Sequence, residues 1–220
     1  MVFGRAPVEA ERVGRAALEA WAEALVGSGL PLALVEPGRP RFTMGAPLAA
    51  GVEGRGELLD LWLTERLPVW RLRTALETLL PADHWFVSAE DVWVGAPPLP
   101  GRVAGADYLV DLQDPPEPGA LDAACARLRA APRIERIREK AGVAKPYDLR
   151  PLLIDVAPAD GASGSAVRMR TRIHPELGSG RPDEVIAALA DELGRPVELA
   201  RIIRERLLLA EDIADRVRLD

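Results

Sequence analysis

The stretch Gly95-Ala96-Pro97-Pro98-Leu99-Pro100-Gly101-Arg102-Val103-Ala104-Gly105 lies near the middle of this 220-residue chain. Proline and glycine interrupt helices and strands, so the stretch predicts a boundary between two folded halves. On its C-terminal side, apolar spacing and turn residues predict a new series of elements. These are a strand at 108–112, a helix at 118–131, a short basic helix at 132–142, strands at 149–156 and 166–173, a helix at 182–194 and a strand at 197–209. Apart from the short helix, this is the β-α-β-β-α-β order of the ferredoxin-like fold.

The N-terminal side of the boundary predicts a related order, α-β-β-β-α-β. The predicted elements are a helix at 7–27, strands at 30–35, 41–44 and 57–63, a helix at 68–80 and a strand at 85–94. This order matches the second half if an opening strand is missing and one strand is split. We therefore predict an α+β fold with two tandem ferredoxin-like (βαββαβ) halves, residues 1–100 and 101–210, the first lacking its opening strand. Residues 211–220 are predicted to form a polar tail.

Composition predicts an ordinary globular protein of the cytoplasm. Hydrophobic residues make up 48% and charged residues 28% of the chain, which is typical of folded domains. The single cysteine, Cys125, excludes an internal disulfide and a cysteine-rich metal site. No apolar run is long enough to cross a membrane. Residues 1–6 lack the apolar segment of a signal peptide.

Basic residues concentrate in the second half, although the net charge is −6. Between residues 127 and 150 there are three acidic residues and eight basic ones: Arg127, Arg129, Arg133, Arg136, Arg138, Lys140, Lys145 and Arg150. Arg168, Arg170 and Arg172 follow with no acid among them. Such a run fits either a surface that binds a polyanion or a solvated helix face.

The arginine series at 168, 170 and 172 makes the sharper prediction. Alternation along a strand places all three side chains on one face, opposite Val167 and Met169. Because three like charges in a row repel, either acids on neighbouring strands pair with them or the face meets an acidic partner. Few aromatic residues lie in this half, which disfavours base stacking on the sheet.

The sequence shows no recognisable catalytic centre. His84 and His174 stand alone, without the spacing of metal ligands. Cys125 lies on the apolar side of a helix, where a buried and inert thiol is expected. The loop at 178–182 precedes a helix and could hold phosphate, yet Asp183 and Glu184 in the first turn would repel it. We therefore predict no catalytic residue, no metal and no cofactor, and no independent catalytic activity.

The tryptophans lie in the first half of the chain. Trp70, Trp85 and Trp93 are predicted to be core residues, as tryptophans more often are. Trp62 is the exception, because it alternates outward between Leu61 and Leu63 and could mark an interface.

An ordered set of short motifs resembles a known family. The N-terminal motifs are Gly29-Leu30-Pro31-Leu32, Arg41-Phe42-Thr43-Met44-Gly45-Ala46-Pro47-Leu48 and Glu57-Leu58-Leu59-Asp60. The C-terminal motifs are Lys145-Pro146-Tyr147-Asp148-Leu149-Arg150-Pro151, Arg181-Pro182-Asp183-Glu184-Val185 and Ala200-Arg201-Ile202-Ile203-Arg204. Together they resemble the radical SAM-linked (radical SAM-associated) protein family, a bacterial domain of unknown function. The family's opening strand and its Ser-His-Leu-Asp segment have no counterpart, since Val8-Glu9-Ala10-Glu11 stands in that place.

The resemblance implies an accessory role beside a radical SAM iron–sulfur protein, whose cluster the partner holds. It also makes RNA a candidate substrate. We predict a surface for nucleic acid or partner binding, and Trp62 as a candidate interface. The surface residues are Lys145, Asp148, Arg150, Arg168, Arg170, Arg172, Arg181, Arg201 and Arg204. The alternative is a protein–protein adaptor that makes no contact with nucleic acid.

Overall fold

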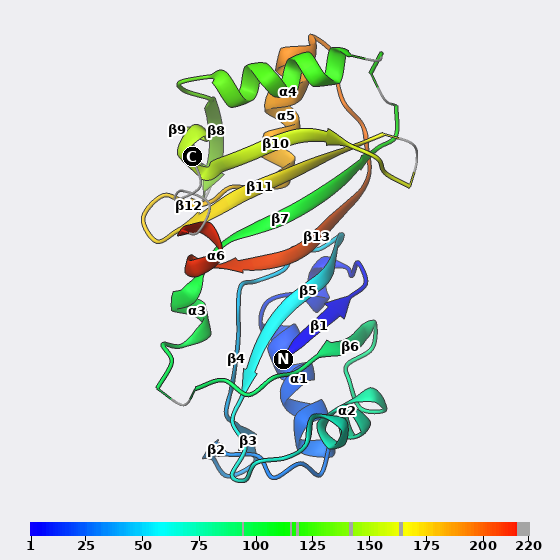
Figure 1. Cartoon of the computed structure of the whole chain (residues 1–220), viewed down its shortest axis with the longest axis vertical. Helices are drawn as coiled ribbons and strands as arrows, with labels where there is room; N and C mark the ends of the chain where they lie inside the picture. Colours follow the sequence, from blue (N-terminus) through cyan, green and yellow to red (C-terminus); the bar gives the residue numbers. More distant parts are fainter. Residues whose placement is uncertain (94, 115, 118, 141–142, 163–164, 215–220) are drawn as a thin grey trace. The chain divides into compact units, whose positions relative to one another are not determined.

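The computed structural model describes residues 1–93, 95–114, 116–117, 119–140, 143–162 and 165–214. The chain divides into two compact units, Met1–Val103 and Ala104–Asp220. The fold is α+β, as predicted, with mainly antiparallel strand pairing and six α-helices among the described residues. Figure 1 shows the helices and strands of each unit.

The first unit holds one sheet, with the strand order β4-β5-β1-β6, and a separate β2–β3 pair. Its elements are β1 (Val2–Arg5), a 3-10 helix (Ala10–Arg12), α1 (Arg15–Gly27), β2 (Leu34–Glu36), β3 (Arg39–Pro40), β4 (Phe42–Met44), β5 (Val52–Leu61), α2 (Val69–Glu77), β6 (His84–Ser88) and α3 (Leu99–Arg102). Phe3, Trp21, Leu25, Leu59 and Leu76 form its buried core.

The opening strand is present, so the prediction that the first half lacks it is wrong. β1 pairs antiparallel with β5 on one side and with β6 on the other. Phe3 is buried and packs edge-on against Trp21, with ring centroids 4.8 Å apart. Six residues ahead of Pro7 give almost no local pattern, and pairing with distant strands supplies the stability instead. α1 begins at Arg15 rather than Pro7, because Gly14 takes a φ of 61°, which an α-helix cannot include.

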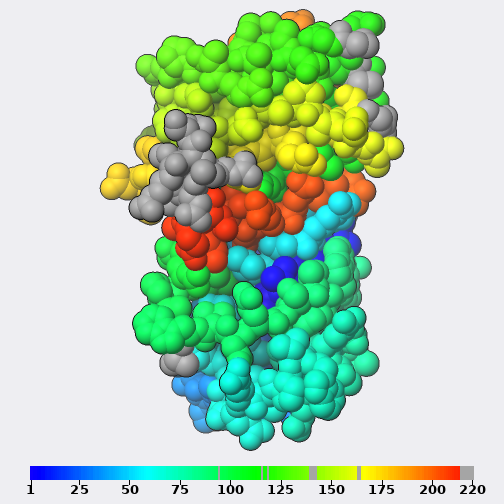
Figure 2. Space-filling view, in the orientation of Figure 1, coloured from blue at the N-terminus to red at the C-terminus, as the bar shows by residue number. Residues whose placement is uncertain are grey.

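The second unit holds a sheet with the order β10-β11-β7-β13, and a separate β8–β9 hairpin. Its elements are β7 (Val103–Leu112), α4 (Ala120–Ala130), β8 (Glu135–Lys140), β9 (Val143–Asp148), a 3-10 helix (Arg150–Leu152), β10 (Leu153–Ala159), β11 (Ala166–His174), β12 (Gly178–Ser179), α5 (Pro182–Leu193), β13 (Leu199–Leu209) and α6 (Ala210–Ala214). Helices α4 and α5 pack side by side. On the face shown in Figure 2, α4 (green) lies at the surface above β10 (yellow).

The predicted short basic helix at 132–142 is wrong, because this segment starts the β8–β9 hairpin. Arginine, glutamate and lysine favour helices, yet Arg136 pairs across strands with Tyr147, and Ile137 with Pro146. Cross-strand pairing here outweighs local propensity. The predicted polar tail at 211–220 begins as α6, and residues 215–220 lie outside the described part of the chain.

Candidate functional site

Arg170 is held inside the second unit by Asp107. In the β7–β11 pair these two residues stand opposite each other. Arg170 donates from Nε to Asp107 Oδ1 at 2.6 Å and from Nη2 to Oδ2 at 2.8 Å. Arg206 of β13 donates to the same Oδ2 at 2.9 Å. Burial alone would raise the pKa of Asp107, but hydrogen bonds from Arg170 and Arg206 outweigh it and hold that pKa below its ordinary value. The Asp107 carboxylate therefore partly neutralises the positive charges of both arginines.

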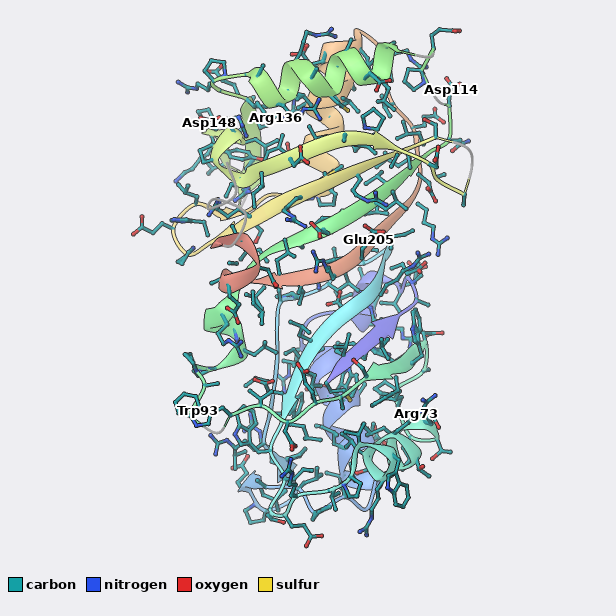
Figure 3. All side chains as sticks on the ribbon, viewed as in Figure 1. Arg73, Trp93, Asp114, Arg136, Asp148 and Glu205 are labelled. Carbon is teal, nitrogen blue, oxygen red and sulfur yellow. The ribbon has the colours of Figure 1, made fainter. Side chains whose placement is uncertain are left out.

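The other two members of the arginine series differ in their surroundings. Arg168 Nε lies 3.3 Å from Glu205 Oε2, in an exposed ion pair. Figure 3 shows Glu205 on β13. Arg172 is half-buried, and no carboxylate of the described residues lies within ion-pair distance of it. Carboxylates on β7 and β13 thus form ion pairs with two of the three arginines. Intramolecular pairing therefore compensates most of the positive charge on this face of β11.

Arg201 and Arg204 are less accessible than a surface for nucleic acid would need, and Arg181 is exposed but bound to a carboxylate. Arg204 is 3% exposed and Arg201 is half-buried. Arg181 Nε donates to Asp183 Oδ1 at 3.0 Å, and its Nη2 binds the other carboxylate oxygen. Because Asp183 binds this guanidinium at the start of α5, the geometry favours an ordinary helix start, without a side-chain cap hydrogen bond, over a phosphate loop at 178–182.

Asp148 closes the base of the β8–β9 hairpin. Its Oδ1 accepts the backbone N–H of Ile134 at 2.9 Å and that of Arg150 at 3.0 Å. The slight burial would raise the pKa of Asp148, but these two N–H donors and nearby arginines lower it. Asp148 therefore joins the two chain segments that enter and leave the hairpin.

Arg136 anchors the hairpin to α5. Its Nε lies 3.2 Å from Glu184 Oε2, and its Nη1 lies 2.6 Å from Asp191 Oδ2. Arg136 and Asp148 both lie near α4 in Figure 3. Together they fix the hairpin on the body of the second unit.

Four cations on or next to the hairpin, on β8, on β9, in the last turn of α4 and in the 3-10 helix after β9, bind no carboxylate among the described residues. Arg138 packs over the Tyr147 ring at 4.6 Å and donates to the Ser179 carbonyl at 3.3 Å. Lys145 stands opposite Arg138 and is exposed. Two arginines at the base donate to backbone carbonyls, Arg129 to Val156 and Arg150 to Leu153 and Arg129. We call these four residues, Arg129, Arg138, Lys145 and Arg150, the hairpin surface.

The tryptophans are less buried than predicted. Trp70 is 68% exposed and Trp93 is 78% exposed, and Trp85 is also exposed, so their prediction as core residues is wrong. α2 turns Leu76 inward and leaves Trp70 outside, while Trp93 lies in the loop after β6. Trp62 is half-buried, with the Arg41 guanidinium 4.6 Å above its ring.

The histidines and the cysteine lie in separate surroundings. His174 Nδ1 accepts backbone N–H groups from Glu176 and Leu177, so it closes a turn. Cys125 is buried, as predicted, and burial raises its pKa to about 11. His84 lines a cavity of about 450 Å³ in the first unit, beside Arg5 and Glu57. Arg5 and Glu57 were not predicted as site residues, because a single charged residue on a strand gives no distinctive pattern in the sequence.

Comparison with known proteins places the chain in a family. A family model described as "Uncharacterized protein conserved in bacteria (DUF2344)" matches residues 36–185. The chain belongs to this family. No curated protein matches. A solved structure, a crystal structure of a Cbf5-Nop10-Gar1 complex, is similar with 13% identity and a TM-score of 0.48. That match covers 94% of this chain and 48% of the other, so the chain spans about half the length of its structural neighbour.

The DUF2344 match runs from the end of β2 into the first turn of α5. It therefore includes Asp107, the whole hairpin surface and the arginine series, while β1 and β13 lie outside it. Among the described residues, no helix is long and apolar enough to span a membrane.

Proposed function

We propose that this DUF2344 protein is an accessory protein that positions a substrate for a radical SAM partner enzyme. RNA is the candidate substrate, and the hairpin surface is the proposed contact. The observation that carries the RNA contact is the pair formed by Arg138 and Lys145, which stand opposite each other without a carboxylate partner in the described residues. The radical SAM partner rests on the sequence motifs alone.

Physical chemistry supports an anionic ligand at this surface. Two adjacent cations repel each other, and a phosphate group between them would remove that repulsion. Arginine binds phosphate oxygens through paired N–H donors. Because Arg136 and Asp148 already anchor the hairpin, its cations lose little freedom on binding.

The residues predicted from the sequence have different proposed roles. Lys145 and Arg150 are proposed to contact the ligand directly as members of the hairpin surface, because neither binds a carboxylate among the described residues. Arg172, outside that surface on β11, is proposed to contribute charge at longer range. Asp148 is proposed to hold the hairpin. The remaining arginines, which are Arg168, Arg170, Arg181, Arg201 and Arg204, are proposed to contribute charge at longer range.

The test is binding of a fluorescein-labelled single-stranded RNA of mixed sequence, followed by fluorescence anisotropy at low salt. The variant is Lys145→Glu combined with Arg138→Gln, which retains a donor for the Ser179 carbonyl. We expect affinity to fall at least about tenfold, since two phosphate contacts would be lost. The matched control, Arg15→Glu with Arg71→Glu, changes exposed arginines of the first unit and should leave affinity within about twofold.

Two results would contradict the RNA contact: equal binding by the hairpin variant and the parent protein, or an equal loss of affinity in the control variant.

The radical SAM partnership is tested separately. The chain and a radical SAM iron–sulfur protein from the same organism should co-elute after co-expression, and separate elution at micromolar concentrations would reject that partnership.

We also infer that both units are ferredoxin-like domains of a cytoplasmic protein, at residues 1–100 and 101–210. The sheet orders support the inference. Taking β1, β4, β5 and β6 as strands one to four, the first unit has the order 2-3-1-4, and β7, β10, β11 and β13 give the same order in the second. A helix follows the first and the third strand in each unit, which is the split βαβ arrangement.

A protein–protein adaptor is the second candidate, favoured by one observation on the same hairpin. Ile137 is 69% exposed and pairs with the exposed Pro146. An apolar residue so placed can pack against a partner chain. Under this alternative, Ile137→Asp would abolish partner binding while Lys145→Glu would not, and no variant would change RNA binding.

A further inference from the structure

Each unit has a strand at one end of its sheet, and the outer edges of these two strands differ. Among the described strands, β6 pairs with β1 alone and β10 pairs with β11 alone. The outer edge of such a strand carries backbone N–H and C=O groups with which another chain can pair. The register shows which groups point outward, because alternate residues of an antiparallel strand turn their backbone groups to opposite sides.

The outer edge of β10 is blocked. The registers of β7, β11 and β10 turn the backbone groups of Leu153, Val156 and Pro158 away from β11. The Leu153 carbonyl accepts from Arg150, and the Val156 carbonyl accepts from Arg129 at 3.2 Å. The Val156 N–H donates to the carboxylate of the residue before it at 2.9 Å, and Pro158 has no N–H to offer. Another strand would therefore find few backbone groups available on β10.

The outer edge of β6 is open in the described part of the chain. Ala6 donates its N–H to the Asp83 carbonyl at 2.8 Å. Counting along the β1–β6 register from this bond turns the backbone groups of Trp85 toward β1 and those of Phe86 away from it. Neither backbone group of Phe86 has a hydrogen-bond partner among the described residues. No Asp, Glu, Lys or Arg stands on β6, although charged side chains are a common protection of sheet edges.

Apolar side chains are exposed beside this open edge. Phe86 packs against the core of the first unit, whereas Trp85 is 40% exposed and Val87 is 46% exposed. A Cβ atom at Gly4 would overlap the Trp85 ring, so the indole lies across the glycine of the neighbouring strand. The edge of β6 therefore combines unpaired backbone groups with exposed apolar surface.

A second copy of the chain fits this edge by symmetry. When two β6 strands pair antiparallel around a two-fold axis at Phe86, the Phe86 N–H of each copy donates to the Phe86 carbonyl of the other. The same register sets Trp85 opposite Val87 of the second copy, and an aromatic residue opposite a β-branched one stabilises a strand pair. Such an interface is self-complementary, as two-fold symmetry requires. Because β6 carries no Asp, Glu, Lys or Arg, these side chains bring no like charges together at the axis.

We propose that the chain associates with a second copy of itself through the outer edges of β6 (His84–Ser88), so that the sheets of two first units join. The paired strands are short, so the association is weak and depends on concentration. This contact uses no residue of the hairpin surface and needs no RNA. The RNA contact and the β6 contact can therefore fail separately.

The first test is sedimentation equilibrium of the full chain between about 5 and about 500 µM. The average mass should rise with concentration toward that of a dimer, with a Kd below about 300 µM. Val87→Lys places a charge on the edge and should weaken association at least about tenfold. Val26→Lys, at an exposed valine of α1, is the matched control and should associate like the parent.

The second test separates backbone pairing from apolar contact. A fluorescein-labelled peptide with the sequence of residues 83–90 should bind the full chain and reduce its dimer fraction. The same peptide methylated on the Phe86 nitrogen keeps its side chains but lacks the outward N–H, and it should bind at least about fivefold more weakly.

Four results would overturn the pairing of two β6 edges. They are a chain that stays monomeric at about 500 µM, unchanged association in Val87→Lys, an equal loss in Val26→Lys, and equal binding of the two peptides. A monomeric chain that still binds the unmodified peptide would assign the edge to a strand of a different protein, which also overturns pairing with a second copy.

Discussion

At the scale of single residues, Asp107 is the carboxylate that compensates two arginines of the sheet in the second unit, Arg170 and Arg206. Arg170 and Asp107 keep only 11% and 13% of their side-chain surface exposed. Removing one partner of such a pair leaves a buried charge uncompensated, which costs more than the pair itself contributes. Asp107 also binds Arg206, so its loss would affect two arginines.

We predict that Asp107→Asn lowers the free energy of unfolding by about 2–3 kcal/mol. The amide keeps one acceptor but turns an N–H₂ group toward a guanidinium. Urea unfolding at pH 7 measures the loss. Glu205→Gln, in the exposed pair with Arg168, is the control and should cost less than about 1 kcal/mol.

The pH dependence of the Asp107 effect has a defined sign. Its folded-state pKa lies below the ordinary value, so its stabilisation is present above the unfolded pKa of about 3.9 and is lost as pH falls through the folded pKa. The difference between Asp107→Asn and the parent should therefore shrink below about pH 4. A difference that stays constant down to pH 3 would mean that the ion pair is not its source.

At the scale of elements, the β8–β9 hairpin shows what a local pattern cannot predict. Its residues favour a helix, and the contacts that make it a hairpin come from elsewhere: Glu184 and Asp191 on α5 bind Arg136. β1 was missed for the same reason, since β5 and β6 stabilise it from both sides. The longer periodic elements, such as α5 and β11, could be predicted because their apolar spacing repeats over several turns or pleats.

Removing the Asp148 carboxylate should destabilise the β8–β9 hairpin locally. In Asp148→Ala, the N–H groups of Ile134 and Arg150 lose their acceptor, so their hydrogen exchange should accelerate at least about tenfold. Amides of α5 should exchange as before. Asp160→Ala, at an exposed residue after β10, is the control. Unchanged exchange at residues 134 and 150 would show that other contacts hold the hairpin.

The candidate site was only partly predictable from the sequence. Alternation correctly placed the three arginines on one face of β11. The carboxylates that pair with Arg170 and Arg168 lie on β7 and β13, far away in sequence. Lys145 and Arg150 were predicted from a motif. Arg138 joins them through the β8–β9 pairing, and Arg129, at the end of α4, through a hydrogen bond from Arg150 to its carbonyl. The cavity in the first unit was not predicted, because Arg5, Thr43, Glu57 and His84 come from four separate strands.

At the scale of the whole molecule, overall charge opposes a polyanion. Residues 104–220 hold 18 Lys and Arg against 21 Asp and Glu, a net charge of −3, and the chain as a whole carries −6. RNA binding must then come from a local group of cations. For single strands, log K falls with log salt with a slope of about −0.7 per phosphate contact. Four cations of the hairpin surface would give a slope of about −3, whereas all eight predicted basic residues would give about −6.

We therefore predict a slope near −3 for the labelled RNA strand between about 50 and 200 mM salt. Lys145→Glu should reduce the magnitude of this slope by about 0.7, because one phosphate contact is lost. Arg71→Glu should lower affinity slightly at every salt concentration and leave the slope unchanged, since a charge outside the proposed contact changes the field without releasing a counterion there. A slope near −6 would indicate that RNA contacts all eight predicted basic residues rather than the four cations of the hairpin surface. The ion pairs of Arg168 and Arg170 would then have to open on binding, and the Asp107→Asn variant would bind RNA more tightly than the parent.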